Sequence, residues 1–244
     1  MKRPAYYAPV GSVKGDLIAL LHPPYTAWHL SYVAMGAALA PRIDWLVLSA
    51  TLLAFFLGTG VAAHALDERN GRPLRTSLGD RTLTLLGIGG LAGALIVAVV
   101  GASVLSPWVL AWAAAGVLLA AGYALERPAA LHTTIGFALA WGGFPVLVGY
   151  WGQAQTLSIG AVFVAASAAL ISMAQRTLST PARHVRRNTT QTELILSRDS
   201  AGRESEERWD EARILATWER PLRLLAWSMV ALAAGLLLAR AFNF

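Results

Sequence analysis

The ten residues from His64 to Pro73 read His-Ala-Leu-Asp-Glu-Arg-Asn-Gly-Arg-Pro, and they mark the abrupt end of an apolar run. The run before them, from Trp45 to Leu66, contains no charged side chain. It is as long as the roughly 20 apolar residues that an α-helix needs to cross a bilayer. The sequence therefore predicts a membrane helix whose polar end carries Asp67 and Glu68.

His64, Asp67 and Glu68 have the spacing of a ligand cluster. Residues three and four apart lie on the same face of a helix, so both carboxylates share a face with His64. His64, Asp67 and Glu68 are therefore a candidate ligand cluster at the polar end of this helix. The alternative interpretation is an ordinary helix end, whose charged side chains are solvated among the lipid head groups.

Arginines follow this cluster closely. Guanidinium groups bind phosphate through paired donors, so a cationic loop beside two carboxylates suits a phosphorylated ligand. Arg72, Arg75 and Arg81 are therefore candidates to bind a phosphate group.

The composition excludes most soluble classes of protein. Of the 244 residues, 56% are hydrophobic and 14% are charged, whereas charged residues make up about 25% of a typical soluble domain. The chain contains no cysteine, which excludes disulfides and thiolate metal sites. Its net charge of +6 follows the expected membrane loops, and no nucleic-acid-binding module is recognisable.

The charge-free intervals predict an all-α integral membrane protein with about seven transmembrane helices. An unpaired charge in the hydrocarbon is costly, by roughly 2.5 to 3.5 kcal/mol on insertion scales. Two intervals are long enough for two helices each, with breaks at Ser106-Pro107 and at residues 152–155. The intervals are 17–41, 45–66, 82–125, 128–175 and 224–239.

Three segments follow from this division. Residues 1–175 are expected to hold an N-terminal segment and a six-helix bundle, and residues 221–244 the last transmembrane helix. Residues 176–220 are expected to form a cytoplasmic polar loop, in which Glu204 to Arg220 resembles an amphipathic helix. The basic run 183–187 in this loop is either a phosphate or anionic-lipid contact or a positive-inside anchor.

The placement of basic residues predicts the topology. Eighteen of the 20 Lys and Arg residues fall on one side of the predicted bundle, and only Arg42 and Arg240 fall on the other. Because cytoplasmic loops are enriched in Lys and Arg, the N-terminus should be cytoplasmic and the C-terminus outside the cell membrane.

Further polar residues should lie near His64. The first helix opens at His22-Pro23-Pro24-Tyr25, with His29 one turn inside, and the fifth helix opens near His132. We therefore expect Tyr25, His29 and His132 to line a shared cavity at the cytoplasmic side. Because imidazole suits transition metals, one alternative is a membrane protein that binds a transition metal or haem through its histidines.

The chain resembles the UbiA-type superfamily of membrane prenyltransferases. Pro24, Thr26 and Gly36 look like that family's opening pattern, and Arg72-Pro73-Leu74 looks like the loop after its first acidic motif. Asp67 matches the second aspartate of that motif, while His64 and Gly71 replace two other acidic positions. The second acidic motif is replaced by basic residues around Arg176 and Arg183.

This resemblance implies a polytopic helical bundle that transfers a prenyl group from a prenyl diphosphate to a membrane-associated acceptor. It implies Mg²⁺ as cofactor, bridging carboxylates and diphosphate. The resemblance then implies that Asp67 and Glu68 act in catalysis and bind the metal together with His64. The residues implied to contact the substrate diphosphate are Arg72, Arg75 and Arg81. Membrane lipids and a prenyl diphosphate are then the expected partners, with no nucleic acid. A member that lost catalysis and serves as a lipid-binding membrane subunit is the other alternative, because fold does not determine function.

Overall fold

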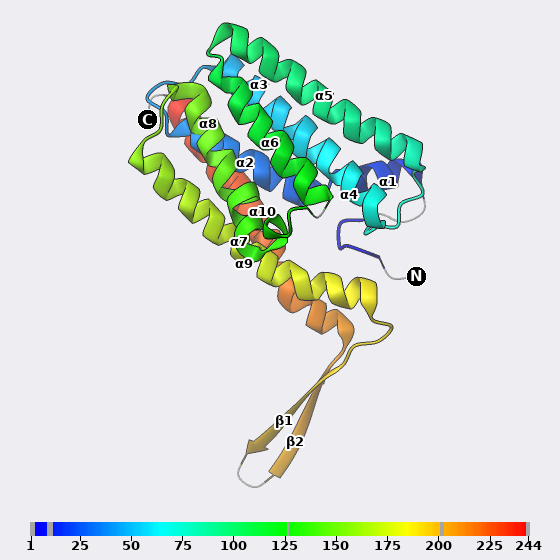
Figure 1. Cartoon of the computed structure of the whole chain (residues 1–244). Coiled ribbons are helices and arrows are strands. Elements are labelled where there is room, and N and C mark those ends of the chain that lie inside the picture. Colours follow the sequence, from blue (N-terminus) through cyan, green and yellow to red (C-terminus); the bar gives the residue numbers. More distant parts are fainter. Residues whose placement is uncertain (1–2, 9–11, 126, 201–202, 243–244) are drawn as a thin grey trace.

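Residues 3–8, 12–125, 127–200 and 203–242 are described in the computed structural model, and they form a helical bundle with one projecting β-hairpin (Figure 1). The α-helices are α1 (Val13–Leu20), α2 (Pro23–Ala38), α3 (Trp45–Phe55), α4 (His64–Gly71), α5 (Asp80–Val104), α6 (Trp108–Ala124), α7 (Thr134–Ala138), α8 (Phe144–Ala154), α9 (Ile159–Asn188) and α10 (Glu211–Ala241). A 3₁₀-helix, η2 (Ala129–His132), precedes α7.

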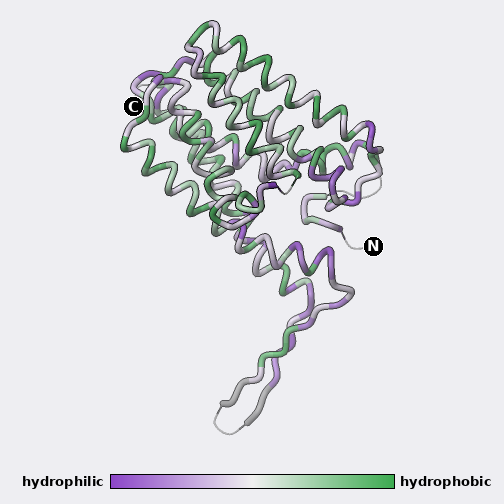
Figure 2. The backbone as a smooth tube through the Cα atoms, in the orientation of Figure 1, coloured by the Kyte–Doolittle hydropathy of each residue, from purple (hydrophilic) through white to green (hydrophobic). Residues whose placement is uncertain are grey.

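Five helical segments of the described chain are long and apolar enough to cross a membrane. They are Trp45–Gly71, α5, Thr134–Ala154, α9 and α10, and the 17-residue α6 is a shorter apolar helix. Large apolar side chains such as Leu85, Ile96 and Phe163 stay exposed on the outer surface. The protein is therefore membrane-embedded and mainly helical, as predicted, with an apolar surface along the bundle (Figure 2).

Helix α2 lies in the centre of the bundle and packs against α8 and α10. The helices α2 and α8 approach so closely that a Cβ atom on Gly36 would lie 2.1 Å from the Val146 carbonyl oxygen. In the same way, a Cβ atom on Gly149 would lie 2.1 Å from the Val33 carbonyl oxygen. Small residues allow membrane helices this contact, and the pair of glycines sets the distance between α2 and α8.

Two segments of the bundle are π-helical. The segment η1 (Phe56–Ala63) joins α3 to α4, and η3 (Leu139–Gly143) joins α7 to α8. At Trp141-Gly142-Gly143 the chain thus continues through wider helical turns rather than breaking. Such π-helical turns often occur at functional sites.

Residues 176–220 differ from the predicted polar loop. Helix α9 continues past residue 176 to Asn188, and α10 already begins at Glu211, where the side chain of Asp210 accepts a hydrogen bond from the Arg213 N–H. Between the helices, β1 (Leu194–Ser200) and β2 (Arg203–Trp209) form an antiparallel hairpin, in which Leu194 pairs with Trp209.

The expected amphipathic helix over Glu204 to Arg220 is therefore wrong for its first part, which is a strand. In the hairpin, backbone groups of residues 204–209 pair with β1 instead of bonding within a helix. The second part is helical, but it is continuous with the last apolar helix through Pro221. The boundaries proposed at residues 176 and 220 thus fall inside helices.

Candidate functional site

A polar cavity of about 360 Å³ lies at the arginine-rich end of the bundle. Its walls come from the N-terminal residues, α2, α4, η3, α9 and α10. The structure brings together in it five residues that were predicted from the sequence: Tyr25, His29, His64, Asp67 and His132. The cavity is also lined by His22, by several residues of α9 and by the N-terminal segment. The sequence did not predict that these residues belong to one site.

His64 lies where the π-helix η1 passes into α4. Its Nδ1 atom lies 3.1 Å from the carbonyl oxygen of Gly60. Because a carbonyl oxygen only accepts, this nitrogen carries the hydrogen and Nε2 keeps a lone pair. The ring stacks on that of His22, with centroids 4.1 Å apart and an angle of 13° between the planes.

His29 and His132 also bond backbone carbonyl oxygens. His29 Nδ1 lies 2.8 Å from the Trp141 carbonyl oxygen, and His132 Nε2 lies 2.6 Å from that of Tyr123. In each ring the bonded nitrogen therefore carries the hydrogen, and the other nitrogen is an acceptor. The cavity thus holds imidazoles whose tautomers are set by the backbone.

Glu68 is fully buried and acts as a structural acceptor. The N–H of Leu74 donates to its Oε2 atom at 2.8 Å, and the N–H and hydroxyl of Thr76 donate to Oε1 at 2.8 and 2.9 Å. These bonds hold the loop after α4 against the helix. Glu68 is not among the residues that line the polar cavity, so its expected role as a metal ligand and catalytic residue is corrected.

The three arginines predicted to bind diphosphate do not line this cavity. Arg72 ends α4 in the left-handed conformation and donates to the Leu78 carbonyl oxygen and the Asp80 carboxylate. Arg75 donates to the carbonyl oxygen of Arg187 at 3.0 Å, and Arg81 is exposed on α5. The contacts of Arg72 and Arg75 depend on the path of the chain after α4, which the sequence spacing does not show.

Arginines of α9 line the cavity instead. Arg176 donates to the hydroxyl of Tyr123 at 3.1 Å and to the carbonyl oxygen of His132 at 2.6 Å. Arg183 and Arg187 reach the cavity from the following turns. The three occupy one face of α9, since separations of seven and eleven residues are close to whole helical turns.

A fourth arginine of α9 is paired. Arg186 donates through Nε and Nη2 to the two carboxylate oxygens of Glu219 on α10. Both side chains are largely buried, with 18% and 6% of their surfaces exposed. This bidentate ion pair joins the polar halves of α9 and α10, and it leaves Asp67 as the other carboxylate among the residues that line the cavity.

The N-terminal strap, which we define as residues 3–8, contributes a further wall. Pro4, Ala5, Tyr6 and Tyr7 line the cavity, and the Tyr7 hydroxyl lies 2.8 Å from Nδ1 of His22. Burial raises the pKa of the Tyr6 phenol to about 12 and also raises the pKa of Tyr7 above its ordinary value. Both phenols are therefore protonated at neutral pH.

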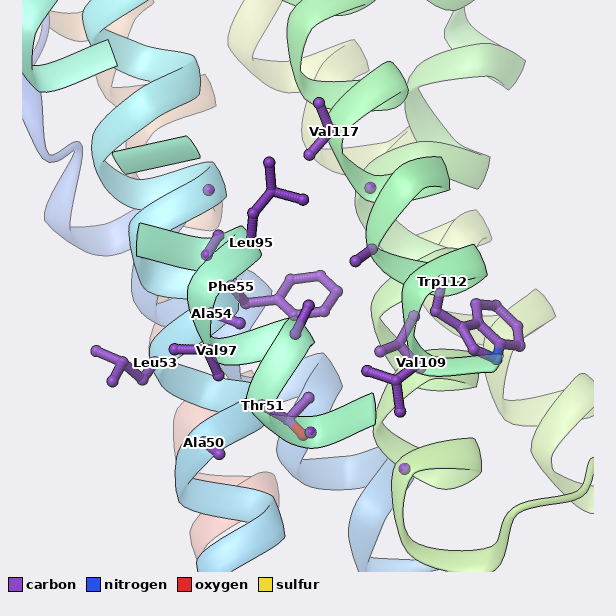
Figure 3. A pocket seen from close by; sticks show the side chains of 18 of the residues that line it. Ala50, Thr51, Leu53, Ala54, Phe55, Leu95, Val97, Val109, Trp112 and Val117 are labelled. Carbon is purple, nitrogen blue, oxygen red and sulfur yellow. The ribbon is translucent and has the colours of Figure 1, made fainter. Parts of the chain in front are cut away.

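An apolar groove of about 440 Å³ adjoins the polar cavity. It runs between α3, α5, α6 and α8, and Figure 3 shows Phe55, Leu95, Val109 and Trp112 around it. Its wall on α3 and η1 extends from Leu46 to Thr59, which corresponds to about 20 Å along the helix axis at 1.5 Å per residue. The groove is therefore long enough for an extended hydrocarbon chain.

The groove and the cavity share two lining residues, Thr59 and Trp141. The indole Nε1–H of Trp141 is buried and makes no hydrogen bond to the described residues. Buried polar groups almost always have partners, so a donor left open at this junction suits a ligand oxygen. The combined site has a cationic compartment, a polar junction and an apolar compartment.

The residues present do not fit the magnesium site that the resemblance implies. Such a site needs two or more oxygen ligands held near one another, but Glu68 is occupied by the loop after α4 and Glu219 is paired with Arg186. Within the described residues no group of three His, Asp or Glu residues could hold a metal ion. Among the described residues, His64, Asp67 and Glu68 therefore do not come together as a group of three metal ligands.

Some of the site was detectable in the sequence. The basic run 183–187 was recognised, and a helical period extended back to Arg176 would have grouped the three arginines on one face. The groove gives no comparable signal, because its apolar residues look like any lipid-facing surface. Comparison with protein-family models, curated proteins and solved structures returned no match.

Proposed function

We propose that this protein is a membrane-embedded prenyltransferase of the UbiA type, which binds a prenyl diphosphate and transfers its prenyl group to a membrane-associated acceptor. The observation that carries the proposal is that the polar cavity and the apolar groove share the lining residues Thr59 and Trp141. A ligand that spans both compartments has an anionic head and a long apolar chain, which is the chemistry of a prenyl diphosphate.

The head group would bind at the face of α9 that carries Arg176, Arg183 and Arg187. Guanidinium groups form bidentate hydrogen bonds with phosphate oxygens and remain charged at any physiological pH. Prenyl transfer breaks the bond between the allylic carbon and oxygen, and the electron pair leaves with the diphosphate. Cations placed before the reaction stabilise the charge that develops on this leaving group.

The acceptor then donates an electron pair to the allylic carbon and loses a proton. The Nε2 atom of His64 has a lone pair because its Nδ1–H is bonded to the carbonyl oxygen of Gly60. This nitrogen and the Asp67 carboxylate are the candidates to take the proton in the cavity. No step is assigned to magnesium, because the described carboxylates do not fit a magnesium site.

The orientation in the membrane is part of the proposal. We place the polar cavity at the cytoplasmic side of the cell membrane, with the N-terminus cytoplasmic and the C-terminus outside, because Lys and Arg gather at the cavity end. Seven membrane crossings then result when the 16-residue α2 and the 17-residue α6 are counted with the five longer segments.

A second candidate function is lipid binding without transfer. It is favoured by the carboxylates, since Glu68 has a structural role and Glu219 is paired. A protein with this site would bind an anionic isoprenoid lipid and present it to a partner. The arginines on the cationic face of α9 would contact the head group of the lipid. The two functions share the ligand and differ in turnover.

The experiment combines lipid identification with a transfer assay. Mass spectrometry of the purified protein should find a copurifying isoprenoid lipid, and a labelled prenyl diphosphate should be consumed with release of pyrophosphate. The assay is run with and without Mg²⁺, on the wild type and on Asp67→Asn, which should lose turnover but keep the bound lipid. Lipid without turnover under every condition would establish the second function, and absence of both would refute the first.

A further inference from the structure

The N-terminal strap occupies donors of the cavity arginines. The Nε–H of Arg187 donates to the Pro4 carbonyl oxygen at 3.3 Å, and Nη1 of Arg186 donates to the Arg3 carbonyl oxygen at 3.5 Å. In Figure 1 the strap lies between the end of α4 and the polar half of α9. A ligand phosphate at Arg187 and the strap in this position therefore compete for the same guanidinium.

The strap is held mainly by polar and aromatic contacts. The Tyr7 hydroxyl bonds His22, and the guanidinium carbon of Arg223 lies 4.8 Å from the centroid of the Tyr6 ring. Its apolar contacts are made chiefly by the small side chains of Ala5 and Ala8, which pack against Ala19 and Leu74. The rings of Tyr6 and Tyr7 make edge-on contacts with Tyr25, at centroid distances of 6.5 and 5.7 Å, so release of the strap has to break these aromatic contacts as well as its hydrogen bonds.

The strap also closes the head-group side of the site. Pro4, Ala5, Tyr6 and Tyr7 all line the polar cavity, whereas none of them lines the apolar groove. Displacement of the strap would open the cationic compartment and leave the compartment for the chain unchanged. The strap therefore covers the part of the site for the head group and not the part for the chain.

We propose that the N-terminal strap is a displaceable gate, which an incoming anionic head group replaces at Arg187. This inference rests on the proposed binding of a prenyl diphosphate and adds how that binding is controlled. The closed arrangement with Pro4 on Arg187 is the resting form, and the bound phosphate takes over the hydrogen bond that the Pro4 carbonyl oxygen gives up. Access of ligand is then limited by release of the strap.

The first test weakens the closed form. Tyr7→Phe keeps the aromatic ring and removes the hydroxyl that bonds His22. With farnesyl diphosphate as probe in calorimetric titration of the full-length protein, the variant should bind about five-fold more tightly, which corresponds to the loss of one ordinary hydrogen bond from the closed form. The matched control is Tyr150→Phe, in the buried cluster with Ala40 and Ala161, which should bind as the wild type does.

The second test reports the position of the strap. The chain has no cysteine, so Ala5→Cys places a single thiol in the strap, where residue 5 is 7% exposed. Farnesyl diphosphate should accelerate its reaction with a maleimide several-fold, whereas the exposed control Thr156→Cys should react at an unchanged rate.

The outcomes separate this inference from the proposed function. If farnesyl diphosphate binds the wild type and Tyr7→Phe equally, and the thiol at position 5 does not become more reactive, the gate is refuted while the ligand site stands. If Tyr7→Phe binds more weakly, Tyr7 holds the ligand rather than the strap, and the gate is again refuted. If no variant binds the probe, the proposed function fails and the gate fails with it.

Discussion

The rings of His22 and His64 stack with their centroids 4.1 Å apart, which joins the start of α2 to the start of α4. Both helices thereby meet at one polar cavity, although 41 residues separate the two histidines in the chain. Tyr7 extends the contact to the N-terminal strap through its bond to His22. The stacked pair thus connects three segments of the chain at the candidate site: the strap, α2 and α4.

The two adjacent carboxylates should respond differently to neutralisation. Glu68→Gln removes a buried charge that accepts three hydrogen bonds, and we expect a loss of about 2 kcal/mol in the free energy of unfolding. Asp67→Asn, at a less buried position that lines the cavity, should cost less stability than Glu68→Gln and abolish turnover. Thermal unfolding in detergent and the transfer assay measure the two effects. Equal loss of stability in both variants would contradict this division of roles.

The arginines of α9, rather than those after α4, should determine affinity for the head group. Arg183→Ala combined with Arg187→Ala should weaken farnesyl diphosphate binding by about 100-fold, given roughly 1.5 kcal/mol for each charge-assisted contact. The matched control is Arg72→Ala combined with Arg81→Ala, which lie outside the cavity and should bind as the wild type does. Titration calorimetry measures both affinities. Weaker binding by the Arg72 and Arg81 variant, with unchanged binding by the Arg183 and Arg187 variant, would support the arginines predicted from the sequence instead.

The apolar groove should recognise the chain and not the head group. Gly116 lines the groove on α6, and Gly116→Leu places a side chain in the space that the prenyl chain needs. We expect farnesyl diphosphate to bind about ten-fold more weakly, a change of about 1.4 kcal/mol, while pyrophosphate binds unchanged. The control is Gly89→Leu on α5, where no atom lies within 4 Å of an added Cβ. A parallel loss for pyrophosphate would show that the variant damages the whole site.

The ion pair of Arg186 and Glu219 should stabilise the junction of α9 and α10. Removal of Arg186 leaves the buried Glu219 carboxylate with its longer ion pair to Arg223, at 3.7 Å, so Arg186→Ala should cost about 2 kcal/mol in the free energy of unfolding. The double variant with Glu219→Ala should cost less than the sum of the single variants, because neither charge then remains. Additive losses in a double-mutant cycle would indicate that the two side chains do not interact.

The sequence predicted the position of several site residues but not their roles. Asp67, His29 and His132 lie in the polar cavity, as the order of the helices and the side of the membrane indicated. Glu68 and Arg72 share the same stretch of sequence, yet both turn to the loop after α4. Their contacts depend on the path of that loop, which spacing along a helix does not describe.

The sequence by itself determined that this is a helical membrane protein, because the cost of placing charge in hydrocarbon depends on each stretch alone. It also determined which end of the bundle is basic. Only the tertiary structure decided that Arg176, Arg183 and Arg187 face a cavity that shares Thr59 and Trp141 with an apolar groove. Helix rotation and the close packing of α2 on α8 set that arrangement, and both depend on contacts between residues far apart in the chain.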